Sequence, residues 1–150
     1  MACLEIIGGK KLYGELAIQG SKNAVLPMLS ACVLSRKNVI LKNCPDIYDV
    51  VCMTSLLKRL GARIEENGHT KSIMCKDIEC MALDKELAGK MRASVLLTGP
   101  LLARCKRVKF PYPGGCVIGS RPIDLHIEAL EKMNVTFVER DGFLYGTTSG

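Results

Sequence analysis

A segment rich in glycine and proline, residues 111–125, holds the side chain best suited to nucleophilic or proton-transfer chemistry. Its sequence is PYPGGCVIGSRPIDL, in which Cys116 stands shortly before Arg121. A nearby cation and the exposed amides of a loop favour the thiolate, which is the reactive form of cysteine. Pro122 suits the first residue of a helix, and Asp124 suits the positive end of a helix. We therefore expect a loop that leads into a helix, with Cys116 either reactive or merely packed in a turn.

A second polar group, GSKN at residues 20–23, precedes the apolar run 24–34. Ser21 suits the amino-terminal cap of a helix, which would place Lys22 and Asn23 at the start of that helix. Arg92 precedes another apolar stretch in the same way. From the residues alone, solvated charges at helix ends explain Lys22 and Arg92 more simply than a binding site does.

Several common kinds of site do not fit this sequence. GGCVIG lacks the GxGxxG spacing of dinucleotide-binding loops, and no GxxxxGK[ST] phosphate loop occurs. His126 has neither a second histidine nor an evident serine partner for a hydrolytic triad, and it is interpreted as an ordinary helix residue. Neither His69 nor His126 is arranged as a zinc ligand. We expect no metal and no cofactor.

The elements that must position these residues form a duplicated pattern. The first copy is predicted as a strand at 39–42, a helix at 47–60 and a strand at 63–66. The second copy is predicted as a strand from 108, a helix at 122–133 and a strand at 136–139. Residues 85–104 between them are predicted as one helix, or as two helices broken at Gly99-Pro100. The similarity of LGARIEENG and MNVTFVERDG indicates a repeated strand, helix and strand unit within one compact α/β domain.

The ends of these units carry helix-stop signals, and the start of the chain carries strand signals. Gly61 and Asn134 stand where the two predicted helices end, at positions that favour a left-handed conformation. Residues 4–7 and 15–18 are predicted as two short strands of a hairpin.

Composition limits the class of protein. With 48% hydrophobic and 24% charged residues the chain is typical of globular proteins. Its longest apolar stretch, residues 95–103, is far shorter than the roughly twenty residues of a membrane-spanning helix. The amino terminus lacks the order of a secretory signal, so we expect a cytoplasmic protein.

The net charge and the cysteine content limit the classes of partner and the redox state that we expect. The net charge of +6 is spread along the chain and aromatic residues are few, which favours a small anionic substrate over nucleic acid or a membrane. The cysteines are predicted to be reduced thiols. Those other than Cys116 are interpreted mainly as small apolar side chains, namely Cys32, Cys44, Cys52, Cys75, Cys80 and Cys105.

Three motifs resemble one family. GSKNAVLP at 20–27, RASVLLTGPLLAR at 92–104 and PGGCVIGSRPIDLH at 113–126 are similar to amino-terminal motifs of the UDP-N-acetylglucosamine 1-carboxyvinyltransferases, which are enolpyruvyl transferases. The cysteine loop is the most specific, because the related shikimate-pathway enzymes share the fold and an early lysine but not this loop. The resemblance covers nearly all of the chain.

The resemblance implies a fold of the inside-out α/β barrel type, in which repeated small α/β units build two similar lobes. Residues 1–20 would then be strands that join the second lobe. Residues 21–150 would form part of the first lobe, with two repeated units, so the lobe is incomplete.

The resemblance also implies a reaction and a set of site residues. Enolpyruvyl would pass from phosphoenolpyruvate to the 3-hydroxyl of UDP-N-acetylglucosamine, with loss of phosphate, as the first committed step of peptidoglycan synthesis. Lys22 and Asn23 would contact phosphoenolpyruvate, and Cys116 would donate a proton and accept covalent modification by epoxides of the fosfomycin type. The UDP-sugar would be bound by Arg92, Arg121, Pro122, Ile123, Asp124 and Leu125.

The chain is much shorter than members of this family. The carboxylate that takes the hydroxyl proton and several substrate-binding arginines would lie beyond residue 150. We therefore expect the chain alone to be inactive and only marginally folded, with a carboxy-terminal portion as its missing partner. Two alternatives stay open: a non-catalytic fragment that binds UDP-sugar or a partner, and a relative of 3-phosphoshikimate 1-carboxyvinyltransferase.

Overall fold

The computed structural model describes residues 3–80, 82–112 and 122–149. The helices of this part are α1 (Lys22–Ala31), η1 (Cys32–Leu34), α2 (Tyr48–Arg59), α3 (Lys85–Gly89), η2 (Arg92–Leu97), α4 (Thr98–Cys105) and α5 (Asp124–Glu131), where η marks a 3-10 helix. The strands are β1 (Asn38–Leu41), β2 (Arg63–Asn67), β3 (Thr70–Met74), β4 (Arg107–Pro111), β5 (Val135–Arg140) and β6 (Phe143–Thr148).

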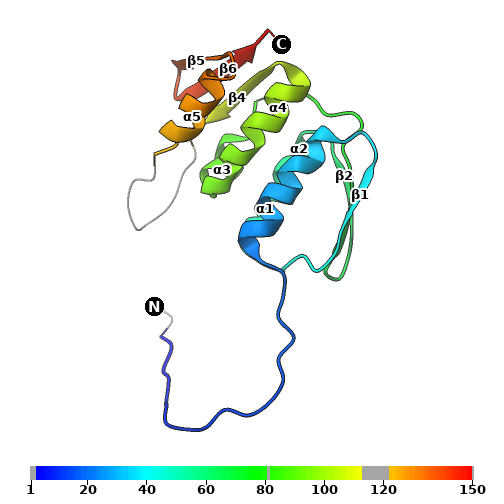
Figure 1. The fold of residues 1–150 in the computed structure, drawn as a ribbon, viewed down its shortest axis with the longest axis vertical. Helices are drawn as coiled ribbons and strands as arrows, with labels where there is room; N and C mark the ends of the chain where they lie inside the picture. Colours follow the sequence, from blue (N-terminus) through cyan, green and yellow to red (C-terminus); the bar gives the residue numbers. More distant parts are fainter. Residues whose placement is uncertain (1–2, 81, 113–121, 150) are drawn as a thin grey trace.

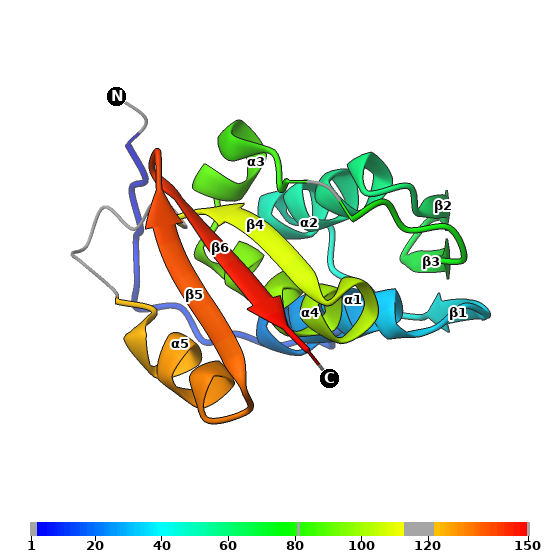
Figure 2. The same cartoon turned by 90° about the horizontal axis from the view of Figure 1, so that it is seen from above.

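These strands form two antiparallel sheets of the same design. The first has the order β1-β3-β2 and the second the order β4-β6-β5, so the last strand of each unit lies in the centre. Helices α1 to α4 lie between the two sheets (Figures 1 and 2). The predicted α/β fold with a duplicated unit is confirmed, and the helices inside the sheets match the inside-out arrangement.

Each unit contains one strand more than the sequence predicted. The predicted strands at 39–42, 63–66 and 136–139 are present as β1, β2 and β5, but β3 and β6 were missed. The turn before β6 has φ values of 55° at Asp141 and 71° at Gly142. Positive φ at both central residues is typical of the tight turn that joins two hairpin strands. Asp141-Gly142 therefore pairs β5 with β6.

The helix-stop signals are confirmed. Gly61 follows α2 with φ 94°, and its amide donates to the Lys58 carbonyl at 3.0 Å. Asn134 follows α5 with φ 63°. Helix α2 also carries Asp49 in its first turn and basic residues in its last turn, which complements the helix dipole.

The connecting segment 85–104 breaks at a different place from the one predicted. It forms α3, η2 and α4, and the chain becomes extended at Met91, with φ −148° and ψ 124°. Pro100 lies in the first turn of α4, where no backbone donor is needed for an intrahelical bond. The Gly99-Pro100 break was therefore wrong, because proline at that position starts a helix rather than interrupting one.

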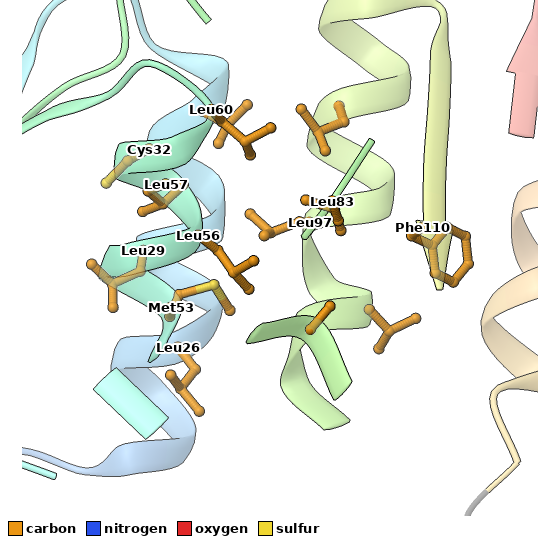
Figure 3. Packing of buried hydrophobic residues seen from close by; sticks show 14 of the residues in the cluster. Leu26, Leu29, Cys32, Met53, Leu56, Leu57, Leu60, Leu83, Leu97 and Phe110 are labelled. Atoms are coloured by element: carbon orange, nitrogen blue, oxygen red, sulfur yellow. The ribbon is translucent and has the colours of Figure 1, made fainter. Parts of the chain in front are cut away.

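The core lies between the helix layers. Met53, Leu57 and Leu97 have no exposed surface, and Val50, Leu60 and Leu101 are 1% exposed. Figure 3 shows Met53, Leu56 and Leu60 of the α2 region pointing toward Leu83 and Leu97. The apolar face predicted for residues 47–60 is thus the face that α2 buries. Helix α5 has no fully buried residue of its own and contributes only the partly buried Ile127 and Leu130.

Residues 3–20 do not form the predicted hairpin. They contain no strand and extend away from the helices and sheets (Figure 1). Their apolar side chains are exposed, from 80% at Ile6 to fully at Tyr13. Two isolated strands are at best marginally stable without a third strand or a packed helix. The strand prediction was wrong for this structure because nothing in it pairs with the segment. That residues 1–20 join a second lobe stays a prediction.

Cys32, Cys44, Cys52 and Cys75 are buried free thiols, as their interpretation as apolar side chains predicts. Burial is the main cause that raises the pKa of Cys32 to about 11, with the nearby Cys75 thiol as a second cause. The expectation of reduced thiols is wrong for one pair. Cys80 and Cys105 form a disulfide with a Cα–Cα distance of 5.7 Å, because the fold brings the segment after β3 against the end of α4.

Within the described ranges, no helix is both long and apolar enough to cross a membrane, and no cluster of three or more histidine, cysteine or acidic side chains could hold a metal ion.

Candidate functional site

A pocket of about 330 Å³ lies where the starts of three helical segments meet. Its polar and apolar lining comes from α1, α2, the junction of α3 and η2, and α5: Lys22, Asn23, Leu26, Asp49, Lys90, Met91, Arg92, Ala93, Val95, Leu96 and His126. The volume is in the range of small-molecule sites. The predicted residues Lys22, Asn23 and Arg92 thus share one cavity.

Lys22 and Asn23 begin α1, as predicted. Ser21 occupies the cap position, where its carbonyl accepts from Ala24 and Val25, but its side chain makes no capping bond. The preceding Gly20 packs tightly, since a Cβ there would lie 2.0 Å from the Asn43 carbonyl oxygen. The start of α1, whose backbone amides carry partial positive charge, is therefore fixed beside the loop that leads to α2.

Asp49 holds the Lys22 ammonium. Lys22 Nζ lies 3.2 Å from Asp49 Oδ2, and the two side chains are 53% and 31% exposed. Ion pairs this exposed contribute at most about 1 kcal/mol. The ion pair therefore holds Lys22 at the pocket, but an anion could take the place of Asp49 on the ammonium at little energetic cost.

The opposite wall is the start of η2. Arg92 Nη2 donates to the Pro122 carbonyl at 2.8 Å, which joins this wall to the entry of α5. Ser30 Oγ of α1 donates to the Leu96 carbonyl at 2.6 Å, and Ser94 Oγ donates to the Ala88 carbonyl at 3.0 Å. The bond from Ser30 links the helix that carries Lys22 to the segment that carries Arg92, and the bond from Ser94 links that segment to α3.

The pocket carries an excess of positive charge. Its described lining contains three cations, Lys22, Lys90 and Arg92, and one carboxylate, that of Asp49. A hydrogen bond from Lys90 to Glu86 raises the pKa of Lys90, so this ammonium stays charged at neutral pH. Cations around a partly apolar cavity favour a small anion, as a phosphate or carboxylate ligand would be.

Four other predicted sugar-binding residues, Pro122, Ile123, Asp124 and Leu125, lie around the entry of α5 and are not part of the described lining of this pocket. Ile123 is 3% exposed and belongs to the core, whereas Leu125 is 80% exposed. Pro122 and Asp124 are exposed, and Pro122 contributes its carbonyl to Arg92. Cys116 and Arg121 lie outside the described residues, and their roles stay predictions.

Asp49, Lys90 and His126 were missed as pocket residues. His126 closes the motif that begins at Pro113, so the motif itself contained a signal for it. No motif pointed to Asp49, because its pairing with Lys22 depends on how α1 packs against α2. Lys90 lies where the chain leaves the helix, and the sequence did not predict that break.

A second cavity of about 360 Å³ lies between α2 and the segment before α3. It is lined by Leu56, Arg59, Leu60, Ala82, Leu83 and Asp84. Among the described residues that line it, the charged ones are Arg59 and Asp84, which form an ion pair with each other. Because these two charges balance, whereas the described lining of the Lys22–Arg92 pocket has more cations than carboxylates, this cavity offers an anion less than that pocket does.

Comparisons with known proteins relate the chain to one group of transferases. The family model described as EPSP synthase (3-phosphoshikimate 1-carboxyvinyltransferase) matches residues 6–146. A UDP-N-acetylglucosamine 1-carboxyvinyltransferase of Wolinella succinogenes is 41% identical over 96% of the chain and 34% of the relative. The UDP-N-acetylglucosamine 1-carboxyvinyltransferase 1 of Legionella pneumophila (strain Lens) is 46% identical over 90% of the chain and 27% of the relative.

A solved structure has the same fold. The enolpyruvyl transferase NikO of Streptomyces tendae superposes with a TM-score of 0.79 at 21% identity, over 95% of this chain and 31% of that one. The chain therefore spans about a third of the length of the relatives that it matches.

Proposed function

Because this chain belongs to the EPSP synthase family of enolpyruvyl transferases, we propose that it forms one part of an active site that transfers enolpyruvyl to UDP-N-acetylglucosamine. The donor is phosphoenolpyruvate, the acceptor is the 3-hydroxyl of the sugar, and phosphate is released. The product is an early intermediate of peptidoglycan synthesis. The carboxylate that accepts the hydroxyl proton is supplied from outside this chain, by the portion that the longer relatives have in addition.

The proposed roles follow the charges of the pocket. Lys22 and Asn23 hold the phosphate or carboxylate of phosphoenolpyruvate at the start of α1, where the helix dipole adds to the lysine charge. Arg92 holds the UDP-sugar together with Arg121 and the residues that follow it, Pro122, Ile123, Asp124 and Leu125. Ile123 contributes through its backbone, because its side chain is buried.

Cys116 is proposed to protonate the methylene carbon of phosphoenolpyruvate while the sugar hydroxyl attacks the adjacent carbon. Loss of phosphate and of a methyl proton then restores the double bond in the product. Such a step needs an acid that titrates near neutral pH and cations that stabilise the developing charge. The same thiol is the expected target of epoxides of the fosfomycin type.

The observation that carries this proposal is the meeting of Lys22, Asn23 and Arg92 in one cationic pocket. These residues come from two of the motifs that resemble the family, and they are far apart in the sequence. The curated relatives favour UDP-N-acetylglucosamine over shikimate 3-phosphate as the acceptor, since they are named for it. A non-catalytic fragment that retains the pocket is the second candidate, because the chain spans only a third of those relatives.

Ligand binding tests the pocket without requiring turnover. Isothermal titration calorimetry would measure phosphoenolpyruvate binding to the chain, with and without UDP-N-acetylglucosamine. Replacing Lys22 with glutamine removes one charged hydrogen bond, which is worth about 1.5–3 kcal/mol. We expect Lys22→Gln to weaken phosphoenolpyruvate binding roughly 10- to 100-fold.

Lys37→Gln is the matched control, since Lys37 is exposed and does not line the pocket. It removes the same charge and should leave the affinity unchanged. Equal losses in both variants would show that only net charge matters and would contradict the assigned role of Lys22. Phosphate release by the chain alone tests the division of the site: we expect none, and sustained release would contradict a site shared between this chain and the additional portion of the longer relatives.

A further inference from the structure

The Cys80–Cys105 disulfide closes a ring of chain around one wall of the pocket. Its two cysteines are 25 residues apart in sequence. The ring contains α3, η2 and α4, and therefore Lys90 and Arg92. Reduction of this bond opens the ring that contains the segment from Lys90 to Arg92, which lines the pocket together with Lys22.

The bond is accessible to small thiols. Cys80 is exposed and Cys105 is half-buried. A small thiolate can therefore attack the bond from the side of Cys80. The buried thiols differ, because desolvation raises the pKa of Cys75 and so disfavours its thiolate.

The disulfide joins the two units at a place where hydrogen bonds also hold them together. Arg104 Nη1 donates to the Val33 carbonyl at 2.7 Å, and Arg104 Nη2 donates to the Lys76 carbonyl. The Leu83 amide donates to the Lys109 carbonyl at 2.9 Å. None of these contacts involves Cys80 or Cys105. Reduction should therefore loosen the ring rather than unfold the domain.

We propose that Cys80 and Cys105 form a reversible redox pair that exchanges with low-molecular-weight disulfides and controls the rigidity of the pocket wall. In the oxidising direction, the exposed Cys80 thiolate attacks the small disulfide, forms a mixed disulfide and releases one small thiolate. The Cys105 thiol then loses its proton and attacks Cys80 Sγ, which releases the second small thiolate. Two protein thiols are oxidised, and one small disulfide is reduced to two thiols.

The oxidised ring has fewer open conformations than the reduced one. A cross-link of this loop length removes conformational entropy from the unfolded chain and from locally opened states. In the oxidised protein, residues 90–97 should therefore open less often. The proposal does not depend on which substrate the pocket binds.

The test compares the full chain in reduced and oxidised glutathione buffers. Intact mass and peptide mapping detect the loss of two hydrogen atoms and the linked Cys80 and Cys105 peptides. We expect the oxidised wild type to unfold at a temperature about 5–15 °C higher than the reduced form. Hydrogen exchange of amides 90–97 should be slower in the oxidised form.

Two variants separate this pair from the other cysteines. The double variant C80S/C105S should lose the response of both unfolding temperature and hydrogen exchange to glutathione. Cys3→Ser is the matched control, because Cys3 is exposed and free, and it should keep the full response. The wild-type comparison needs no substitution, so it decides the matter even if the double variant fails to fold. The proposal is overturned if oxidation links other cysteines, or if the linked protein shows the same unfolding temperature and exchange rates as the reduced one.

Discussion

Gly20 provides a direct test of how the Lys22 end of the pocket is fixed. A Cβ at this position would lie 2.0 Å from the Asn43 carbonyl oxygen and 3.2 Å from its carbon. Real Cβ atoms essentially never approach closer than 3.0 Å, so Gly20→Ala must displace one backbone by about 1 Å. Both neighbours are backbone groups, and no flexible side chain can move aside to relieve the contact.

Overpacking of this kind costs about 1–3 kcal/mol. For a chain of this size each kcal/mol lowers the unfolding temperature by roughly 2–4 °C, so we expect a decrease of about 3–10 °C in Gly20→Ala. The displacement occurs next to the first turn of α1. It should therefore also weaken phosphoenolpyruvate binding, although no pocket side chain has been changed.

Thermal unfolding followed by circular dichroism measures the effect. Gly8→Ala is the control, since a Cβ at Gly8 meets nothing within 4 Å and the same methyl group is added. It should leave the unfolding temperature unchanged. If Gly20→Ala unfolds at the same temperature as Gly8→Ala, the close approach to Asn43 does not hold the start of α1, and the reasoning fails.

Two further predictions concern stability. Hydrogen bonds from Lys71 and Lys58 lower the pKa of Glu66 below its ordinary value of 4.5. The Glu66 carboxylate therefore stabilises the fold above pH 4.5, and this stabilisation is lost as the pH falls through the lowered pKa. Urea unfolding should show that the free energy of unfolding falls less on acidification in Glu66→Gln than in wild type. The difference should be under about 1 kcal/mol, because Glu66 is partly exposed. A larger fall in the variant than in wild type would contradict this assignment. Leu29→Ala should lower the free energy of unfolding by about 2–5 kcal/mol, because Leu29 is fully buried. The control Leu34→Ala should lower it by well under half as much, because Leu34 is 57% exposed. Equal losses would contradict the position of the core.

The sequence predicted the elements whose signals are local. The helix at 47–60 has apolar residues at helical spacing and a glycine at its end, and α2 matches it closely. The duplication was visible because the hairpin turns and helix ends recur in the same order. Lys22 and Arg92 were found through motif resemblance, and both line one cavity in the fold, whereas their roles stay predictions.

The missed features depend on contacts between distant residues. Strand β6 contains Gly146, which weakens a strand pattern. In the fold, a Cβ at Gly146 would lie 2.6 Å from the Phe137 ring, so the glycine makes room for an aromatic side chain of the neighbouring strand. The converse holds for residues 4–7 and 15–18, whose alternating pattern predicts strands although this structure contains no partner for them.

The central position of β3 and β6 has a consequence for how the chain folds during synthesis. In both sheets the two outer strands form their ladders with the strand that the ribosome makes last, and β4 makes one further bridge, between Lys109 and Ala82. The first sheet can therefore close once residue 74 has left the exit tunnel, but β4 and β5 cannot join into a sheet until β6, which ends at residue 148, has also left it. Vectorial synthesis should produce an intermediate in which the first unit is folded while the second is still open.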